Sequence, residues 1–216
     1  MKETGFLFDL DGVILDTEPQ YNVFWGGQFM KHYPAQPDLH FAIKGQTLGE
    51  IYNRFFPDTE LQNKITEELN LFERDMPMPW VSGFPDFARQ IQAAGFKALI
   101  VTSSNKPKMN SVFRQHPDLR ELVSGVISSE DFSSSKPSPE CYIKGAERLG
   151  LEPCRCIAFE DSVNGLTSAS RAKTKVVGLT TSLTNKYISE LHLADLIIPD
   201  FSNLILKNLL VDLEIQ

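Results

Sequence analysis

Six short apolar runs recur along the chain and constrain its fold more than any other feature. They lie at Gly5–Phe8, Ala98–Val101, Gly125–Ile127, Cys156–Phe159, Val176–Leu179 and Leu196–Ile198. Helix-like stretches lie between the later runs. One opens at Ser138-Pro139 and ends at Gly150, and another is capped by Asp161-Ser162 and runs to about Ala172. Strand–helix alternation of this kind indicates parallel βαβ units, so the sequence predicts an α/β fold.

The segment between the first and second apolar runs breaks that alternation. It shows helical patterns near Glu18–Lys31, Leu48–Phe56 and Thr59–Asp75, without a convincing strand and with prolines inside and after it. We therefore expect a small helical insert at residues 16–81, and a core domain made of residues 1–15 and 82–216. The core resumes with a helix at Phe84–Ala94.

Composition and charge narrow the class of protein. The chain has 216 residues, 42% of them hydrophobic, and a net charge of −7 without a basic tract, which disfavours nucleic acid as a partner. Its apolar runs fall short of the roughly 18–20 residues of a membrane span, and its first residues do not form a secretory signal. Three cysteines suggest no disulfide framework. We expect a cytoplasmic protein.

Four of the predicted strands are followed by residues that can do chemistry. In chain order these are Asp9 and Asp11, then Thr102, Ser103 and Ser104, then Lys136, and finally Glu160 and Asp161. Ligands of open α/β sheets bind beyond the carboxyl ends of the strands. The fold would therefore bring four carboxylates, a hydroxyl and a lysine together.

The paired aspartates suggest what this site binds, since neighbouring carboxylates repel unless a cation offsets them. Several carboxylates make a hard oxygen site of the kind that Mg²⁺ prefers, and a lysine with a hydroxyl can hold an anion. Together these are the components of phosphoryl transfer. Asp9 can attack phosphorus to form an aspartyl phosphate, while Asp11, on the same face of the extended segment, donates and later removes a proton.

The same residues resemble the motifs of the haloacid dehalogenase-like superfamily, in the branch that contains β-phosphoglucomutase and many small-molecule phosphatases. The matching segments are Asp9-Leu10-Asp11-Gly12-Val13, Thr102, Lys136 within SKPSPE, and FEDSVNG from Phe159 to Gly165. The resemblance spans almost the whole chain. It implies a Rossmann-like three-layer α/β/α sandwich with a parallel sheet, and a helical cap inserted after the first strand.

The resemblance also implies roles for these residues. Asp9 is the nucleophile and Asp11 the general acid/base, while Thr102 and Lys136 hold the transferring phosphoryl group. The implied Mg²⁺ ligands are Asp9, Asp11 through its backbone carbonyl, Asp161, and Glu160 near the metal. The implied substrate is a small phosphorylated metabolite, such as a sugar or polyol phosphate, and the implied oligomeric state is a monomer.

Two departures from the mutase pattern favour a phosphatase. In the mutase, a histidine that partners the acid/base follows the first motif, and Tyr21 stands at that place here. The mutase cap also carries an arginine for the second phosphate of its substrate, and Leu48 stands there. Asp16-Thr17-Glu18-Pro19 resembles the phosphatases of the branch. A phosphohexomutase remains the alternative.

Further residues are candidates for lining the substrate space. They are Tyr21, Trp25, Lys44, Gln46, Ser103 and Asn105, with Lys106 for a second anionic group. Tyr21 and Trp25, four residues apart, could instead simply pack within a helix. Thr102–Ser104 and Glu160–Asp161 could likewise serve as helix caps.

Two other classes of protein share part of this pattern. A signalling receiver domain also uses strand-end acids, Mg²⁺ and an aspartyl phosphate, but its acidic pair is adjacent and it lacks a large insert after the first strand. A non-catalytic binding protein could keep the fold. The presence of every residue that the chemistry needs disfavours this alternative.

Overall fold

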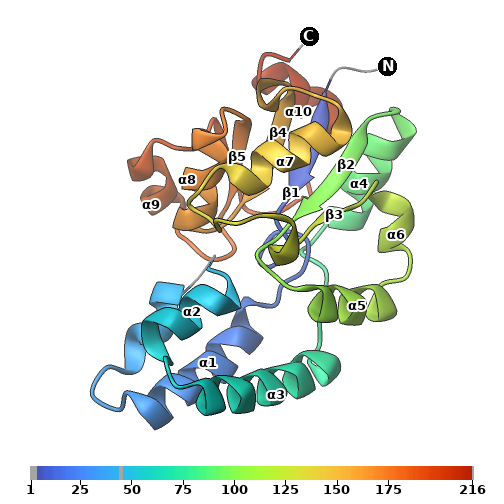
Figure 1. The fold of residues 1–216 in the computed structure, drawn as a ribbon. Helices are drawn as coiled ribbons and strands as arrows, with labels where there is room; N and C mark the ends of the chain where they lie inside the picture. Colours follow the sequence, from blue (N-terminus) through green and yellow to red (C-terminus); the bar gives the residue numbers. More distant parts are fainter. Residues whose placement is uncertain (1–3, 44–45, 216) are drawn as a thin grey trace.

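The computed structural model describes residues 4–43 and 46–215, and within them six parallel strands form one sheet (Figure 1). The strands are β1 (Gly5–Phe8), β2 (Lys97–Val101), β3 (Val126–Ile127), β4 (Cys156–Glu160), β5 (Lys175–Leu179) and β6 (Leu196–Ile198). Their order is β3-β2-β1-β4-β5-β6. The first strand, β1, therefore lies in the middle of the sheet, between β2 and β4. All six predicted strands are confirmed.

Helices cover both faces of the sheet. They are α4 (Phe84–Ala93), α5 (Lys106–Gln115), α6 (Leu119–Leu122), α7 (Glu140–Leu149), α8 (Val163–Arg171), α9 (Asn185–Leu191) and α10 (Leu206–Asp212), with short 3-10 turns η2 (Ser129–Asp131) and η3 (Pro153–Arg155). Side chains alternate between the faces of β1. Phe6 and Phe8 pack with α4, α5, α6 and α10, whereas Leu7 packs with α7, α8 and α9. The expected three-layer α/β/α sandwich is confirmed.

The segment after β1 forms a second, smaller body of helices with its own hydrophobic core (Figure 1). Its elements are α1 (Glu18–His32), η1 (Pro37–Ile43), α2 (Leu48–Phe55) and α3 (Thr59–Asp75). Phe29 and Phe56 lie at the centre of that core. The two connections to the sheet body run antiparallel, since Asp16 N donates to Pro79 O at 2.8 Å and Val81 N to Ile14 O at 3.0 Å. This pairing places the helical body over the carboxyl end of β1.

Two predicted helix ends are confirmed, and one helix begins one residue later than predicted. Gly150 ends α7 in the left-handed conformation, and the Ser162 hydroxyl caps α8 by accepting from Gly165 N at 3.0 Å. α7 begins at Glu140 rather than at Pro139, but the expected side-chain contact of Ser138 is present, because Glu140 N donates to Ser138 Oγ at 3.3 Å. Ser138 also closes the preceding turn, because its backbone N–H donates to Ser135 O at 2.9 Å.

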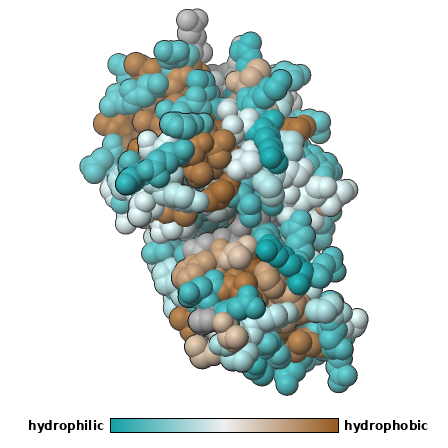
Figure 2. All heavy atoms as spheres, turned by 90° about the vertical axis from the view of Figure 1, so that its left-hand side faces the viewer, coloured by the Kyte–Doolittle hydropathy of each residue, from teal (hydrophilic) through white to brown (hydrophobic). Residues whose placement is uncertain are grey.

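The outer surface is mixed in character. Figure 2 shows hydrophobic and hydrophilic atoms interspersed over both parts of the molecule. Exposed large apolar side chains occur on several elements, including Val23 and Met30 on α1 and Val211 on α10. Scattered apolar side chains are normal on protein surfaces, so we assign them no function. Among the described residues, no helix has both the length and the apolar character needed to span a bilayer.

Candidate active site

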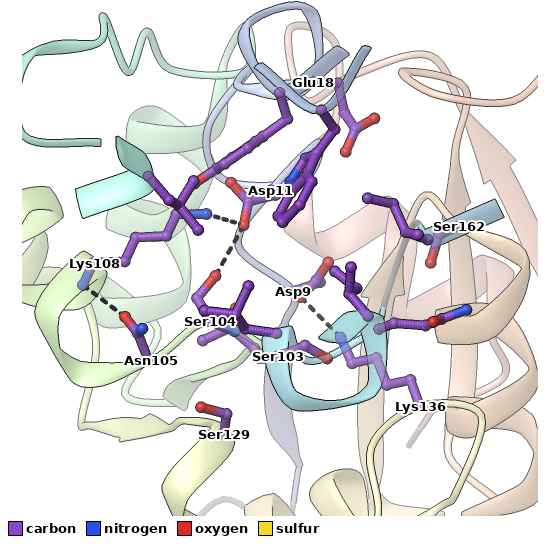
Figure 3. Close-up of a pocket in the computed structure, with 18 of the residues that line it drawn as sticks. Asp9, Asp11, Glu18, Ser103, Ser104, Asn105, Lys108, Ser129, Lys136 and Ser162 are labelled. Carbon is purple, nitrogen blue, oxygen red and sulfur yellow. Dashed lines mark hydrogen bonds and ion pairs between the residues drawn. The ribbon is translucent and has the colours of Figure 1, made fainter. Parts of the chain in front are cut away.

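A cavity of about 150 Å³ lies between the sheet body and the helical body. The sheet body contributes strand-end residues, among them Asp9, Thr102 and Asp161, and the helical body contributes Tyr21 and Gln46. Figure 3 shows the labelled side chains converging on this space from both sides. Convergence follows from topology, because all parallel strands end at one edge of the sheet.

Lys136 is the central cation of the site. Its side chain is 1% exposed, and its Nζ lies 2.8 Å from Asp9 Oδ1 and 2.6 Å from Glu160 Oε1 (Figure 3 shows the Asp9 contact). It also donates to Val101 O at 3.1 Å. Burial alone would lower the pKa of Lys136, but the two carboxylates outweigh it and raise that pKa above its ordinary value. Lys136 is therefore a permanent positive charge beside Asp9.

Asp9 follows β1 directly, and its surroundings shift its acidity. Burial is the largest cause and raises the pKa of Asp9 to about 7, while Lys136 acts in the opposite direction and Glu160 adds to the rise. Such a carboxyl group gains from any further positive charge placed beside it, because a cation favours its ionised form. Its position next to Lys136 suits a group that attacks an anionic centre.

The carboxylates at the ends of β1 and β4 can hold a divalent cation. One oxygen each from Asp9, Glu160 and Asp161 lies within 4.8 Å of the others. Burial raises the pKa of Asp161 well above its ordinary value, and Glu18 is the largest of the neighbouring charges that raise it further. Oxygen ligands of this kind suit a hard cation, which would offset the crowded negative charge.

Glu160 is mainly engaged in holding other residues of the site. It is fully buried, accepts from Tyr142 Oη at 2.5 Å and is paired with Lys136. Gly165 lies so close to Glu160 that a Cβ atom at this position would collide with the Glu160 carboxylate. The motif from Phe159 to Gly165 therefore packs tightly around Glu160. The role expected for Glu160 near the metal stays a prediction.

The loop after β2 supplies hydroxyl groups. Thr102 is 1% exposed and its Oγ1 accepts from Ser104 N at 3.0 Å, while Thr102, Ser103 and Asn105 all line the cavity. The helix cap here is Asn105, whose Oδ1 accepts from Lys108 N at 3.0 Å. Thr102 is therefore not the cap of α5, which leaves it available for the phosphoryl group.

Asp11 lies on the side of the cavity that faces the helical body. Thr17 Oγ1 donates to its Oδ1, while Ser104 Oγ at 3.2 Å and Lys108 Nζ both donate to its Oδ2. Figure 3 shows the Ser104 and Lys108 contacts as dashed lines. A carboxylate with three donors has a defined orientation, as a proton-transferring group needs.

The predicted residues of the helical body have mixed outcomes. Tyr21, Trp25 and Gln46 line the cavity, and Tyr21 and Trp25 also pack among aromatic side chains, so the two interpretations of this pair are compatible. Lys44 lies outside the described residues. Lys106 is exposed at the start of α5 and is not among the residues that line the cavity, so its contact with a second anionic group stays a prediction.

Comparisons with known proteins decide the family. The model of the haloacid dehalogenase-like hydrolases matches residues 4–173. The chain belongs to the haloacid dehalogenase-like hydrolases. This confirms the relationship that the four motifs suggested.

Two curated relatives and one solved structure are similar to this chain. The fructose-1-phosphate phosphatase YqaB of Escherichia coli (strain K12) is 26% identical over 179 residues, which are 78% of this chain and 92% of that protein. The bifunctional riboflavin kinase/FMN phosphatase of Arabidopsis thaliana is 28% identical over 81% of this chain, which spans about half (46%) of that longer protein. A β-phosphoglucomutase from Clostridium difficile shares the fold, with a TM-score of 0.79 at 20% identity over 99% of this chain and 98% of that one.

Sequence reasoning missed Lys108, which does line the cavity of this hydrolase. Its side chain is 3% exposed, and its Nζ lies 4.4 Å from the centre of the Tyr21 ring in addition to its contact with Asp11. One available signal was helical spacing, because Lys108 lies one turn beyond Asn105, the cap of α5. Glu18 and Glu73 also line the cavity without having been predicted.

The raised pKa of Asp9 predicts how the free energy of unfolding of the metal-free protein depends on pH. The pKa of Asp9 rises from an ordinary value of 3.8 to about 7 on folding, so the folded protein binds this proton more tightly than the unfolded chain. Its contribution to stability is complete below about pH 4 and is lost as the pH rises to about 7. In EDTA, we expect the melting temperature of the wild type to show this loss of stability over the same pH range. The melting temperature of Asp9→Asn should not show it. Identical pH profiles of the two proteins would contradict the shift.

Proposed function

We propose that the protein is a Mg²⁺-dependent phosphatase that hydrolyses a small phosphorylated metabolite through an aspartyl-phosphate intermediate. The observation that carries this proposal is the 2.8 Å contact between Lys136 Nζ and Asp9 Oδ1 beside the Asp161 carboxylate. A nucleophile between a fixed cation and a divalent-cation site is suited to attack on an anionic phosphorus centre.

In the first step, Asp9 attacks phosphorus and the bond to the leaving oxygen breaks. Lys136 and Thr102 hold the equatorial oxygens, and the Asp11 carboxyl gives its proton to the departing alkoxide. Asp9 and Asp161 would hold Mg²⁺, which, when bound, neutralises negative charge on the phosphoryl group and on the nucleophile.

In the second step, Asp11 takes a proton from a water molecule that attacks the phosphorus of the aspartyl phosphate. The bond between phosphorus and Asp9 breaks, and phosphate leaves with the Asp9 carboxylate restored. The helical body acts as a cap over the site, which limits the access of bulk water to the intermediate. We propose that this cap comprises residues 16–81, and that the core comprises residues 1–15 and 82–216.

The substrate class is a sugar or polyol phosphate. The relatives named as phosphatases of fructose 1-phosphate and of hexitol phosphates support it. The cavity supports it as well, because polar groups such as Asn22 and Gln46 stand beside apolar ones such as Trp25 and Leu48. Such a wall can bind hydroxyls and carbon faces together. We further propose that the protein acts as a cytoplasmic monomer, without nucleic acid or membrane as a partner.

A β-phosphoglucomutase-like activity is the alternative, favoured by the shared fold with proteins of that name. Tyr21 and Leu48, which stand at the two mutase positions, speak against it. Tyr21 Oη donates to Glu73 Oε1 at 2.7 Å, so it is engaged within the cap. A non-catalytic or receiver-like phospho-aspartate protein would instead show no turnover, or only slow self-dephosphorylation.

The test is orthophosphate release from a panel of sugar, polyol and nucleotide monophosphates, with Mg²⁺ and with EDTA. We expect release from one small group of esters, abolished by EDTA and restored by added Mg²⁺. The panel includes β-glucose 1-phosphate with a coupled assay for glucose 6-phosphate. Conversion of that ester without phosphate release would establish a mutase, and no turnover of any ester would refute an enzymatic role.

A further inference from the structure

Lys108 is a buried lysine to which the four motifs assign no role. It lies in the first turn of α5, and Figure 3 shows its side chain running from that helix into the cavity. With 3% of its side chain exposed, the ammonium has lost most of its contact with water. Burying a charge is costly unless it is paired, so its partners indicate what it does.

The first partner is the acid/base of the proposed mechanism. Lys108 and Ser104 both donate to Asp11 Oδ2, and Thr17 donates to Oδ1. An ammonium has only donors, so Lys108 keeps Oδ2 as an acceptor. The Thr17 hydroxyl on Oδ1, unlike an ammonium, can rotate and accept a hydrogen bond instead of donating one. Oδ1 is therefore the oxygen of Asp11 that is better suited to exchange a proton with the substrate.

The second set of partners belongs to the cap. The Lys108 ammonium lies 4.4 Å from the centre of the Tyr21 ring, within cation–π range. Tyr21 in turn donates to Glu73 Oε1, and Glu73 is 6% exposed. The positive charge of Lys108 also lowers the pKa of Glu73, although burial has the larger and opposite effect. One ammonium thus stands between an acid of the core and an acid of the cap.

We propose that Lys108 is a positioning residue that holds the Asp11 carboxyl group in the orientation for protonating the leaving oxygen of an alkyl phosphate. The inference rests on the proposed phosphatase function and adds a residue to it. In the step concerned, Asp9 forms a bond to phosphorus, the bond from phosphorus to the leaving oxygen breaks, and the Asp11 proton moves to that oxygen. Lys108 keeps its proton and charge throughout.

The test replaces Lys108 with methionine, which has a similar length but no charge, and compares two classes of ester. Alkyl phosphates need a proton on the leaving oxygen, whereas 4-nitrophenyl phosphate releases a stable anion without one. The measured quantity is kcat/KM, which covers the steps up to departure of the leaving group. For the best alkyl ester of the panel we expect a loss of about 100-fold, and for 4-nitrophenyl phosphate a loss below about fivefold.

Two further variants serve as controls for this interpretation. Lys207→Met removes an exposed lysine of α10, remote from the cavity, and should change neither kcat/KM. Lys108→Met leaves the Asp11 and Glu73 carboxylates without their shared cation, which could impair folding. The double variant Glu73→Gln/Lys108→Met removes that excess charge, and we expect it to keep the same difference between alkyl and aryl esters.

The outcomes separate this inference from the proposed function. Equal losses for both esters in a folded Lys108→Met variant would overturn the positioning role. Recovery of normal alkyl-ester hydrolysis in the double variant would do the same, because Lys108 would then only offset the charge of Glu73. A wild-type protein without activity on any ester would overturn the phosphatase function itself, and this inference with it.

Discussion

Replacing Asp9 with asparagine is expected to abolish turnover while the protein stays folded. An amide cannot form the acyl phosphate, and loss of a nucleophile costs roughly 10⁴-fold or more in kcat. Asparagine has nearly the same shape, and Lys136 Nζ keeps Glu160 Oε1 at 2.6 Å and Val101 O at 3.1 Å as partners. Steady-state phosphate release and circular dichroism measure the two effects.

Trapping the intermediate gives this prediction a second readout. Wild-type protein quenched in acid during turnover should carry a phosphoryl group, and the Asp9→Asn variant should carry none. Asp86→Asn is a matched control, because Asp86 is an exposed residue of α4 that pairs with Arg89 at the surface. Turnover or labelling that persists in Asp9→Asn would place the nucleophile elsewhere.

Removing the charge of Lys136 is expected to harm both activity and stability. In Lys136→Met the buried Glu160 carboxylate and the partly buried Asp9 carboxylate lose their common cation, and breaking a buried ion pair costs about 3–5 kcal/mol. Lys136 also lowers the pKa of Asp9, so its loss favours the protonated, non-nucleophilic form. Loss of one stabilising charge in the transition state adds about 10²–10³-fold in kcat. Urea unfolding and phosphate release measure these changes.

Two companion variants separate stability from catalysis. Lys175→Met breaks an exposed pair with Asp195, for which we expect a change in unfolding free energy of at most about 1 kcal/mol. Lys136→Met/Glu160→Gln removes the uncompensated charge of Glu160, so it should regain stability without regaining activity. Activity that returned together with stability would show that Lys136 only supports the fold.

The sheet was predictable from the sequence because its strands are short and apolar, and the central ones are buried on both faces. Each such run stands out between polar turns, and the observed strands begin or end within a residue of the predicted ones. Helices α5, α6, α9 and α10 were not predicted. α6, α9 and α10 are short, and α5 has a largely polar sequence (KPKMNSVFRQ) with few apolar residues to mark a buried face. Most of their stability comes from packing in the folded protein, which is not a local property of the sequence.

The motif residues of the site were predictable for a topological reason. Asp9, Thr102 and Asp161 each follow a strand, and parallel strands bring their ends to one edge, so no side-chain geometry was needed to place them together. Lys108 follows no strand. Its approach to Asp11 depends on the direction in which α5 leaves the loop after β2, and Tyr21 reaches it only because the cap folds back over the core.

The sequence by itself therefore determined the six strands, the helical character of the segment after the first strand and the types of side chain that follow the strands, because local periodicity and residue type carry that information. The tertiary structure decided the pairings. It joined Lys136 to Asp9 and Glu160, turned Lys108 toward Asp11, and left Lys106 at the surface. The physical reason is that the energy of a buried charge depends on the distances to its partners, and those distances exist only once the core and the cap have packed together.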